Sequence, residues 1–321
     1  MAATQKSLPV DEIRYNPRFR FSSDRDPGIL AASIRESGIL SPLVLVRDVS
    51  GSLDLFAGFR RYQAAMDLGL KEVPVRIAAK GEDRGRVFYG VLLEQLCFRM
   101  LTLLEKARVL KIMEILEVRG ALRTTFMELL QIPDQRSVIE SLQSLAASPF
   151  SLQAFVELHQ PPLKMVEPLL EWSPEDLDIL MQAAGALQLR PVELLEIAGL
   201  AKEAAGRDRE PVAACLEAAG IREWILPGNP LPRGRKIQVL KQRLYQRRHP
   251  RLSEWNEGLD KLKESSRPPP GTEILWDRTL EKPGLEIRSA LRNKEDLHRL
   301  SEWLNRETVI QVLDGMFPVA G

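Results

Sequence analysis

The sequence predicts three successive domains: an α+β domain, an all-α domain and a small α+β domain. Short apolar runs separated by turn residues predict strands within residues 1–88. Leucines at helical spacing, interrupted by prolines, predict a series of short helices in residues 89–205. Helical stretches and two further strand-like runs predict mixed structure in residues 206–321.

Three strands are expected in the first domain. Residues 43–46 and 53–56 are apolar runs on either side of a turn at Ser50-Gly51. Residues 73–77 form a third strand. Pro74 within it should mark a sheet edge or a strand start, because proline cannot donate a backbone hydrogen bond.

Two short helices complete this domain. The first has Asp26 as its N-cap and Pro27 as its first residue, and it stops at Gly38. The second covers about residues 60–68. It is closed by Gly69, a residue type that accepts the left-handed cap conformation.

Prolines and aromatic residues predict the helix breaks and the core of the rest of the chain. Helix breaks are expected at Pro133, Pro149, Pro161-Pro162, Pro174 and Pro191. In the last domain, strands are expected at residues 273–277 and 285–289, and helices at about 294–305 and 307–316. The aromatic residues interpreted as filling a small core or a partner groove are Trp276, Trp303 and Phe317.

Composition excludes several classes of protein. Hydrophobic residues make up 44% and charged residues 28% of the 321 residues, as in globular chains that fold without metal or disulfide. No apolar run approaches the ~18 residues of a membrane-spanning helix, and the start lacks a signal-peptide core. Cys97 and Cys215 form no disulfide framework, which favours the cytoplasm, and Cys97 is expected in the core. Three separated histidines exclude a histidine-rich metal centre, and a net charge of +1 excludes a globally basic nucleic-acid coat.

The clearest chemistry lies in Ala57-Gly58-Phe59-Arg60-Arg61, followed by Tyr62-Gln63-Ala64-Ala65. A strand ends here, a glycine turns the chain, and a helix starts. Free N–H groups at a helix start favour an anion, and Gly58 allows a ligand to approach the backbone. Arg60 and Arg61 supply planar donors that match phosphate oxygens. The pattern indicates a phosphate cradle; the alternative is a solvated Arg-Arg pair at a helix start.

Residues 8–78 resemble the N-terminal domain shared by ParB-type partition proteins and sulfiredoxin. The resemblance is carried in order by Asn16-Pro17, by Ser33-Ile34 through Pro42-Leu43-Val44-Leu45-Val46, by Gly58-Phe59-Arg60-Arg61 with Ala64-Ala65, and by Leu68-Gly69-Leu70 through Val73-Pro74-Val75. It continues more weakly to about residue 200. Sulfiredoxin chemistry requires a cysteine in the phosphate turn, and this turn has none.

The resemblance to partition proteins implies a pocket that binds CTP with Mg²⁺. By this resemblance Gly58, Arg60 and Arg61 bind the phosphates, and Ser41-Pro42 borders the base. A second family motif, ENxxR, supplies metal and phosphate contacts. Its nearest counterparts here are Glu94, Gln95 and Arg99. The resemblance also implies a homodimer and a partition-ATPase-like protein partner.

Two departures from the family bear on catalysis. The glutamate of the family's GERR turn, linked with hydrolysis, is replaced by Phe59, which cannot orient water or accept a proton. The counterpart of ENxxR has Gln95 in place of asparagine and one residue too many before Arg99. Nucleotide binding is therefore expected with weak or absent CTP hydrolysis.

A degenerate helix-turn-helix is expected at residues 124–142, because partition proteins carry one after the nucleotide domain. Gln131 replaces the usual turn glycine, and Gln135, Arg136 and Ser137 could reach base edges. Residues 121–149 contain two basic and three acidic residues, a net charge of −1. This charge disfavours tight binding to DNA. The alternative is a purely structural helical pair.

A stronger basic signal lies at residues 233–251, which contain eight basic residues and no acid. These residues are Arg233, Arg235, Lys236, Lys241, Arg243, Arg247, Arg248 and Arg251. They indicate a helix that contacts phosphates. The alternative is a basic helix that faces acidic residues elsewhere in the fold, or solvent.

Three functions follow from these patterns. The first is a CTP-responsive, DNA-binding protein of the chromosome or plasmid partition type. The second is a nucleotide-gated adaptor that has lost operator recognition and holds a protein partner. The third, a small-molecule kinase on the same fold, is disfavoured because Phe59 leaves no obvious base.

Overall fold

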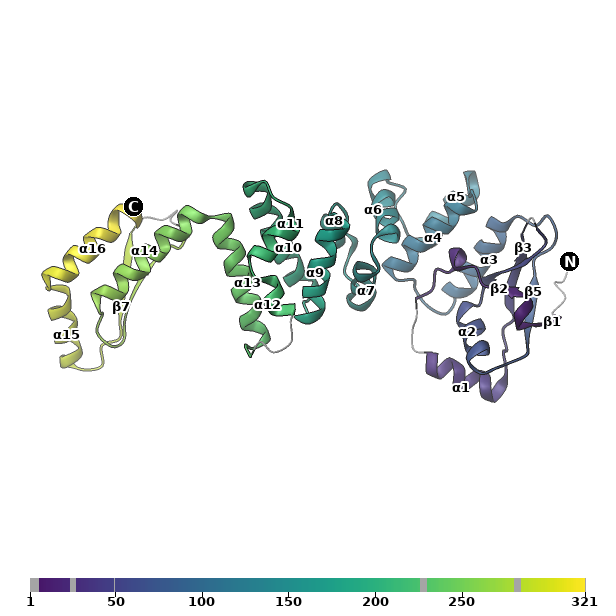
Figure 1. The fold of residues 1–321 in the computed structure, drawn as a ribbon, viewed down its shortest axis with the longest axis horizontal. Coiled ribbons are helices and arrows are strands. Elements are labelled where there is room, and N and C mark those ends of the chain that lie inside the picture. Colours follow the sequence, from purple (N-terminus) through teal and green to yellow (C-terminus); the bar gives the residue numbers. More distant parts are fainter. Residues whose placement is uncertain (1–5, 24–26, 49, 226–229, 280–283, 321) are drawn as a thin grey trace. The chain divides into compact units, whose positions relative to one another are not determined.

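The fold is that of a computed structural model, which describes residues 6–23, 27–48, 50–225, 230–279 and 284–320 (Figure 1). The chain divides into two compact units. The first unit comprises residues 1–185 with 189–192, and the second comprises residues 186–188 with 193–321. The first unit runs across residue 88 without a division. The domain boundaries expected at residues 88 and 205 remain predictions.

The first unit begins with a mixed five-stranded sheet in the order β1-β5-β3-β4-β2. Its strands are β1 (Lys6–Pro9), β2 (Ile13–Arg14), β3 (Leu43–Arg47), β4 (Leu53–Ala57) and β5 (Glu72–Ile77). β3 pairs antiparallel with β4 and parallel with β5. Four successive residues of β3, Leu43 to Val46, are buried, as expected of a central strand covered on both faces. The three strands expected from apolar runs are confirmed.

The expectation that Pro74 marks a sheet edge or a strand start is wrong. It lies inside β5, which is flanked by β1 and β3, so it marks neither a sheet edge nor a strand start. The reason is that β1, formed by the start of the chain, pairs antiparallel on the outer side of β5 and takes the edge position. Ser7 of β1 lies opposite Pro74.

Two helices, α1 (Pro27–Ser37) and α2 (Phe59–Asp67), pack side by side (Figure 1). Gly38 follows α1 with a φ of +72°, and Gly69 follows α2 with a φ of +67°. Both glycines therefore adopt the left-handed conformation that ends a helix, as the sequence predicts. Asp26, the expected N-cap of α1, lies outside the described residues.

The rest of the first unit is helical. Its helices are α3 (Arg84–Leu96), α4 (Leu103–Ile115), α5 (Gly120–Leu130), α6 (Arg136–Ala147), α7 (Phe150–His159), α8 (Leu163–Leu170) and α9 (Pro174–Ala186). The prolines at which helix breaks were expected lie at the starts of helices or in the links between them. Pro149 is the N-cap of α7, and Pro162 is the N-cap of α8. Cys97 is exposed, so its expected place in the core is wrong. It is the C-cap of α3, where the chain leaves the helix and its apolar face.

The second unit contains helices α10 (Pro191–Asp208), α11 (Val212–Ala218), α12 (Ile221–Ile225), α13 (Arg233–Arg248), α14 (Pro250–Ser266), α15 (Lys294–Leu304) and α16 (Glu307–Ala320). Strands β6 (Thr272–Trp276) and β7 (Leu285–Ser289) form an antiparallel pair. Trp303 is buried with Leu259, Ile274 and Val309, and Trp276 packs against this core. The side chain of Phe317 lies outside the described residues. No helix in the described ranges is long and apolar enough to cross a membrane.

Candidate functional site

The candidate site is built on the turn between β4 and α2. β4 ends at Ala57, Gly58 has a φ of +93°, and α2 begins at Phe59. A Cβ atom on Gly58 would lie 2.6 Å from Cδ2 of Leu43 and 3.4 Å from its Cα. Glycine is therefore required both by the left-handed backbone and by the close approach of β3. The first N–H groups of a helix have no acceptor within the helix, and such groups favour an anion.

A cavity of about 180 Å³ lies beside this turn, and we call it the cradle cavity. Its lining comes from the turn itself, from the end of α3 and from two segments that precede β3. The lining residues are Phe21, Ser22, Leu30, Ala57, Gly58, Phe59, Arg60, Arg61, Val91, Gln95 and Arg99. The volume is below the ~300 Å³ of most small-molecule sites, so the cavity matches a phosphate group better than a whole nucleotide.

Both arginines predicted to bind phosphate line the cradle cavity. Arg60 is half-buried. Arg61 donates from Nη1 to the carbonyl oxygen of Pro42 at 3.1 Å and also to that of Ser41. Burial holds the pKa of the Arg61 guanidinium below its ordinary value, and the carboxylate of Glu94 acts in the opposite direction. Ser41 and Pro42, expected to border the base, lie outside the cavity lining and instead hold Arg61 through their carbonyl groups.

Phe59 gives the cavity an apolar wall where the family has glutamate. Its side chain is 6% exposed. The ring packs edge-on against Tyr15 with centroids 5.6 Å apart, and Tyr15 in turn lies 5.9 Å from the ring of Tyr62. Phe59 is therefore part of an aromatic cluster under the turn and offers no group that could accept a proton.

Helix α3 and the residues that follow it bring two of the three residues of the second motif to the cavity. Gln95 and Arg99 line it, whereas Glu94 is exposed and lies outside the lining. Burial lowers the pKa of Arg61, and the carboxylate of Glu94 partly opposes this shift, so its charge acts near the turn.

Arg99 makes a two-pronged ion pair that sequence reasoning missed. Its Nη1 and Nη2 donate to Oε2 and Oε1 of Glu105 at 2.6 and 2.7 Å. Glu105 is completely buried and also accepts from the backbone N–H groups of Ser23 and Thr102, each at 3.0 Å. Burial alone would raise the pKa of Glu105, but these hydrogen bonds outweigh it and hold the pKa below its ordinary value. The one signal in the sequence was Thr102-x-x-Glu105, the spacing of a capping box.

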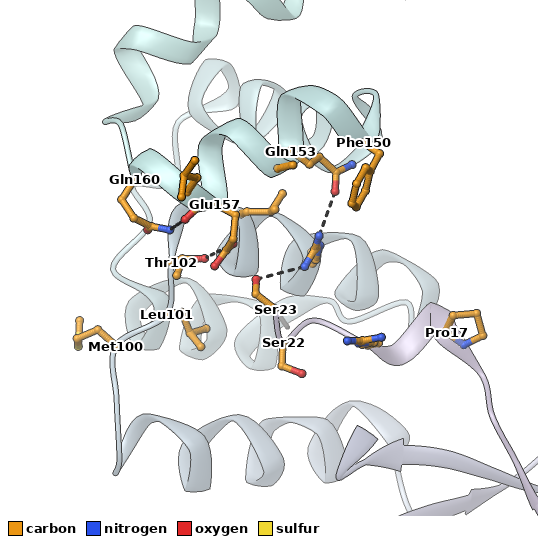
Figure 2. Close-up of a pocket in the computed structure, with 15 residues that line it drawn as sticks. Pro17, Ser22, Ser23, Met100, Leu101, Thr102, Phe150, Gln153, Glu157 and Gln160 are labelled. Carbon is orange, nitrogen blue, oxygen red and sulfur yellow. Dashed lines mark hydrogen bonds between the residues drawn. The ribbon is translucent and has the colours of Figure 1, made fainter. Parts of the chain in front are cut away.

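A larger cavity of about 930 Å³ shares Ser22 with the cradle cavity. Figure 2 shows Gln153, Glu157 and Gln160 of α7 on one side of it and Ser22 and Ser23 on the other. Arg108 joins the two sides, because it donates to Ser23 Oγ at 3.4 Å and to Gln153 Oε1 at 3.1 Å. The segment 22–23 therefore separates two cavities, and no pattern in the sequence pointed to the larger one.

The stretch expected to form a helix-turn-helix consists of α5, a turn and α6. Gln131 has φ and ψ of 53° and 45°, the left-handed conformation that the usual glycine would adopt. Gln135, Arg136 and Ser137 are exposed at the start of α6. Arg136 forms an ion pair with Glu140 at 2.6 Å, one helical turn further on.

Apart from Arg251, the basic residues of this stretch lie in α13, and five of the seven cations of this helix pair with acids of the same unit. Arg247 contacts Glu210 at 2.6 Å and Asp208 at 3.2 Å. The other ion pairs are Arg233 with Glu193, Lys241 with Glu196, Arg243 with Glu223, and Arg248 with Glu203. Arg235 is exposed and donates to Gln238, and Lys236 is half-buried. Arg251 is exposed at the start of α14. This arrangement favours the alternative of a basic helix that faces acids of its own fold.

Residues 2–91 match the family described as the ParB N-terminal domain. The chain is similar to the probable plasmid-partitioning protein ParB of Thermus thermophilus, with 46% identity over 82 residues, 25% of this chain and 26% of that protein. It is also similar to the probable chromosome-partitioning protein ParB of Vibrio cholerae, with 34% identity over 127 residues, 36% of this chain and 43% of that protein. The matches thus span well under half the length of these relatives.

Among solved structures, the chain is similar to the C-terminally truncated chromosome-partitioning protein ParB of Caulobacter crescentus complexed with CTP-gamma-S. The identity is 22%, and the match covers 53% of this chain and 94% of that chain with a TM-score of 0.27.

Proposed function

We propose, from the premise that residues 2–91 belong to the ParB N-terminal domain family, that this chain is a cytoplasmic partition protein whose cradle cavity binds CTP. The observation that carries the proposal is the pair Arg60 and Arg61 in the lining of a cavity at the start of α2. Guanidinium groups match phosphate oxygens in geometry, and the N-terminus of α2 adds backbone donors. Because the cavity holds about 180 Å³, the sugar and base would extend beyond it.

Mg²⁺ would accompany the nucleotide through its phosphates. Magnesium in such sites is usually held by one or two carboxylates together with phosphate oxygens. Glu94, whose charge acts on Arg61, is the carboxylate that supports this role. Binding without turnover is proposed because Phe59 places carbon atoms where the family has an acid.

Calorimetry with Mg²⁺ tests the nucleotide site. We expect CTP to bind in preference to ATP, GTP and UTP, and Arg60→Ala to weaken CTP binding about tenfold or more. Arg76→Ala is the matched control, because Arg76 is exposed on β5 outside the cavity lining. A folded protein that binds none of the four nucleotides would remove this function from the domain.

We propose the start of α6 as the contact with DNA in preference to α13. Gln135, Arg136 and Ser137 are exposed. Arg136 pairs with Glu140, but its side chain is 91% exposed, whereas the five paired cations of α13 are only 30–39% exposed. Retention of the protein on DNA cellulose at low salt tests this assignment. Arg136→Ala should reduce retention, and Lys164→Ala on the exposed face of α8 serves as the control.

The nucleotide-gated adaptor is the second candidate, and the pairing of α13 favours it. A helix whose cations are neutralised within its own unit has little charge to offer phosphates. Absence of DNA retention at low salt, together with intact CTP binding, would select the adaptor over the DNA-binding protein.

A further inference from the structure

We propose that Glu105 is a positioning residue for nucleotide binding, which holds Arg99 and the segment 21–23 in the wall of the cradle cavity. The inference rests on the proposed nucleotide function of that cavity. Arg99, Phe21 and Ser22 line the cavity, whereas Glu105 lies outside the lining and is completely buried. Glu105 can therefore act on a ligand only through the groups that it holds.

The geometry of the ion pair leaves Arg99 able to bind a second anion. A guanidinium carries five N–H groups, two on each terminal nitrogen and one on Nε. Glu105 takes one from Nη1 and one from Nη2, and the carbonyl oxygen of Met100 takes another from Nη1 at 3.3 Å. No described residue accepts from the Nε–H or from the second hydrogen of Nη2, and these two groups form the side-on fork that a phosphate accepts in two-pronged fashion.

The same carboxylate also holds a second part of the cavity wall. It accepts the backbone N–H of Ser23, which directly follows the lining residues Phe21 and Ser22. It also accepts the backbone N–H of Thr102 and so anchors the start of α4. One buried charge thereby sets the spacing between Arg99 and the segment 21–23, which come from parts of the chain about 80 residues apart.

A double-mutant cycle on CTP affinity tests the inference. Glu105→Gln keeps the size of the side chain but removes the charge and one of the two acceptor oxygens. It should weaken CTP binding about tenfold, because Arg99 loses its fixed orientation. In an Arg99→Ala background the same change should have a clearly smaller effect, since only the segment 21–23 is then left for Glu105 to hold. Asp260→Asn is the matched control, because it breaks a similar two-pronged pair with Arg278 in the second unit.

Each outcome of these experiments supports or overturns the inference about Glu105. Unchanged or tighter CTP binding by Glu105→Gln overturns the inference, and so does an additive loss in the Arg99→Ala background. If Glu105→Gln does not fold by circular dichroism, Arg99→Lys replaces it: this variant keeps the charge but not the fork, and wild-type affinity overturns the inference. Wild-type protein that binds no nucleotide removes this inference and the proposed function together. Loss with Arg60→Ala but not with Glu105→Gln removes this inference alone.

Discussion

The guanidinium of Arg61 donates a hydrogen bond to the carbonyl oxygen of Pro42 at 3.1 Å, and this contact ties the start of α2 to the segment that leads into β3. Arg61 therefore has a structural role besides its place in the cavity lining. It closes the turn by donating to the carbonyl groups of Ser41 and Pro42.

Replacing Arg61 should therefore cost stability as well as ligand affinity. Arg61→Ala leaves two carbonyl groups without their donor, and we expect the free energy of unfolding to fall by about 1–2 kcal/mol. Arg76→Ala, at an exposed position of β5, should lower it by less than half of that. Urea unfolding of both variants without nucleotide measures the difference. An equal loss of stability in the two would contradict the separate role of Arg61.

Position 59 should not tolerate the glutamate that the family has there. Phe59→Glu would place a carboxylate in an aromatic cluster at a site that is 6% exposed, beside Tyr15. We expect the free energy of unfolding to fall by about 3 kcal/mol or more, with no gain in phosphate release from CTP. Thermal unfolding and a phosphate-release assay measure the two quantities.

Phe59→Leu is the control for this substitution, because it keeps an apolar side chain in the same cluster. Its cost should be clearly smaller than that of the glutamate variant. Phosphate release by a stable Phe59→Glu protein would show instead that the aromatic cluster rearranges and that the missing acid alone prevents hydrolysis.

Local features of this fold could be predicted from the sequence, whereas long-range pairings could not. Gly58 could be assigned to the cradle because a strand end, a glycine and a helix start are all local patterns. Glu105 could not, because its partner Ser23 lies 82 residues away and contact across that distance leaves no trace in spacing. The cations of α13 form a visible cluster in the sequence. The acids that pair with them precede them by 20 to 45 residues, as Glu210 precedes Arg247 by 37.

Gln131 offers a test of the turn between α5 and α6. With a φ of 53°, it occupies a conformation that a Cβ atom makes unfavourable by about 1 kcal/mol relative to glycine. Gln131→Gly should therefore raise the free energy of unfolding by about 0.5–1 kcal/mol, measured with urea. Gln131→Ala keeps the Cβ atom and should give no such gain. Destabilisation by glycine would mean that the amide of Gln131 makes a stabilising contact.

The depressed pKa of Glu105 predicts a pH dependence of stability. The ordinary pKa of this carboxyl is 4.5, and in the folded protein it lies lower. The unfolded chain therefore takes up the proton first as the pH falls. The stability that Glu105 contributes is full above pH 4.5 and is lost as the pH falls through the lower folded-state value. The difference in unfolding free energy between wild type and Glu105→Gln should shrink over that range. A difference constant from pH 6 to pH 3 would contradict an ionised Glu105.

Substitution of Arg247 tests whether the cations of α13 stabilise the fold or bind DNA. It pairs with Glu210 and Asp208, and all three side chains are less than a third exposed, so Arg247→Ala should lower the free energy of unfolding by about 1 kcal/mol. Retention on DNA cellulose should stay unchanged under conditions where the variant is folded. Arg251→Ala is the matched control, because Arg251 is exposed and should leave stability unchanged. Loss of DNA retention with full stability in Arg247→Ala would mean that DNA displaces the two acids, and α13 would return as a nucleic-acid contact.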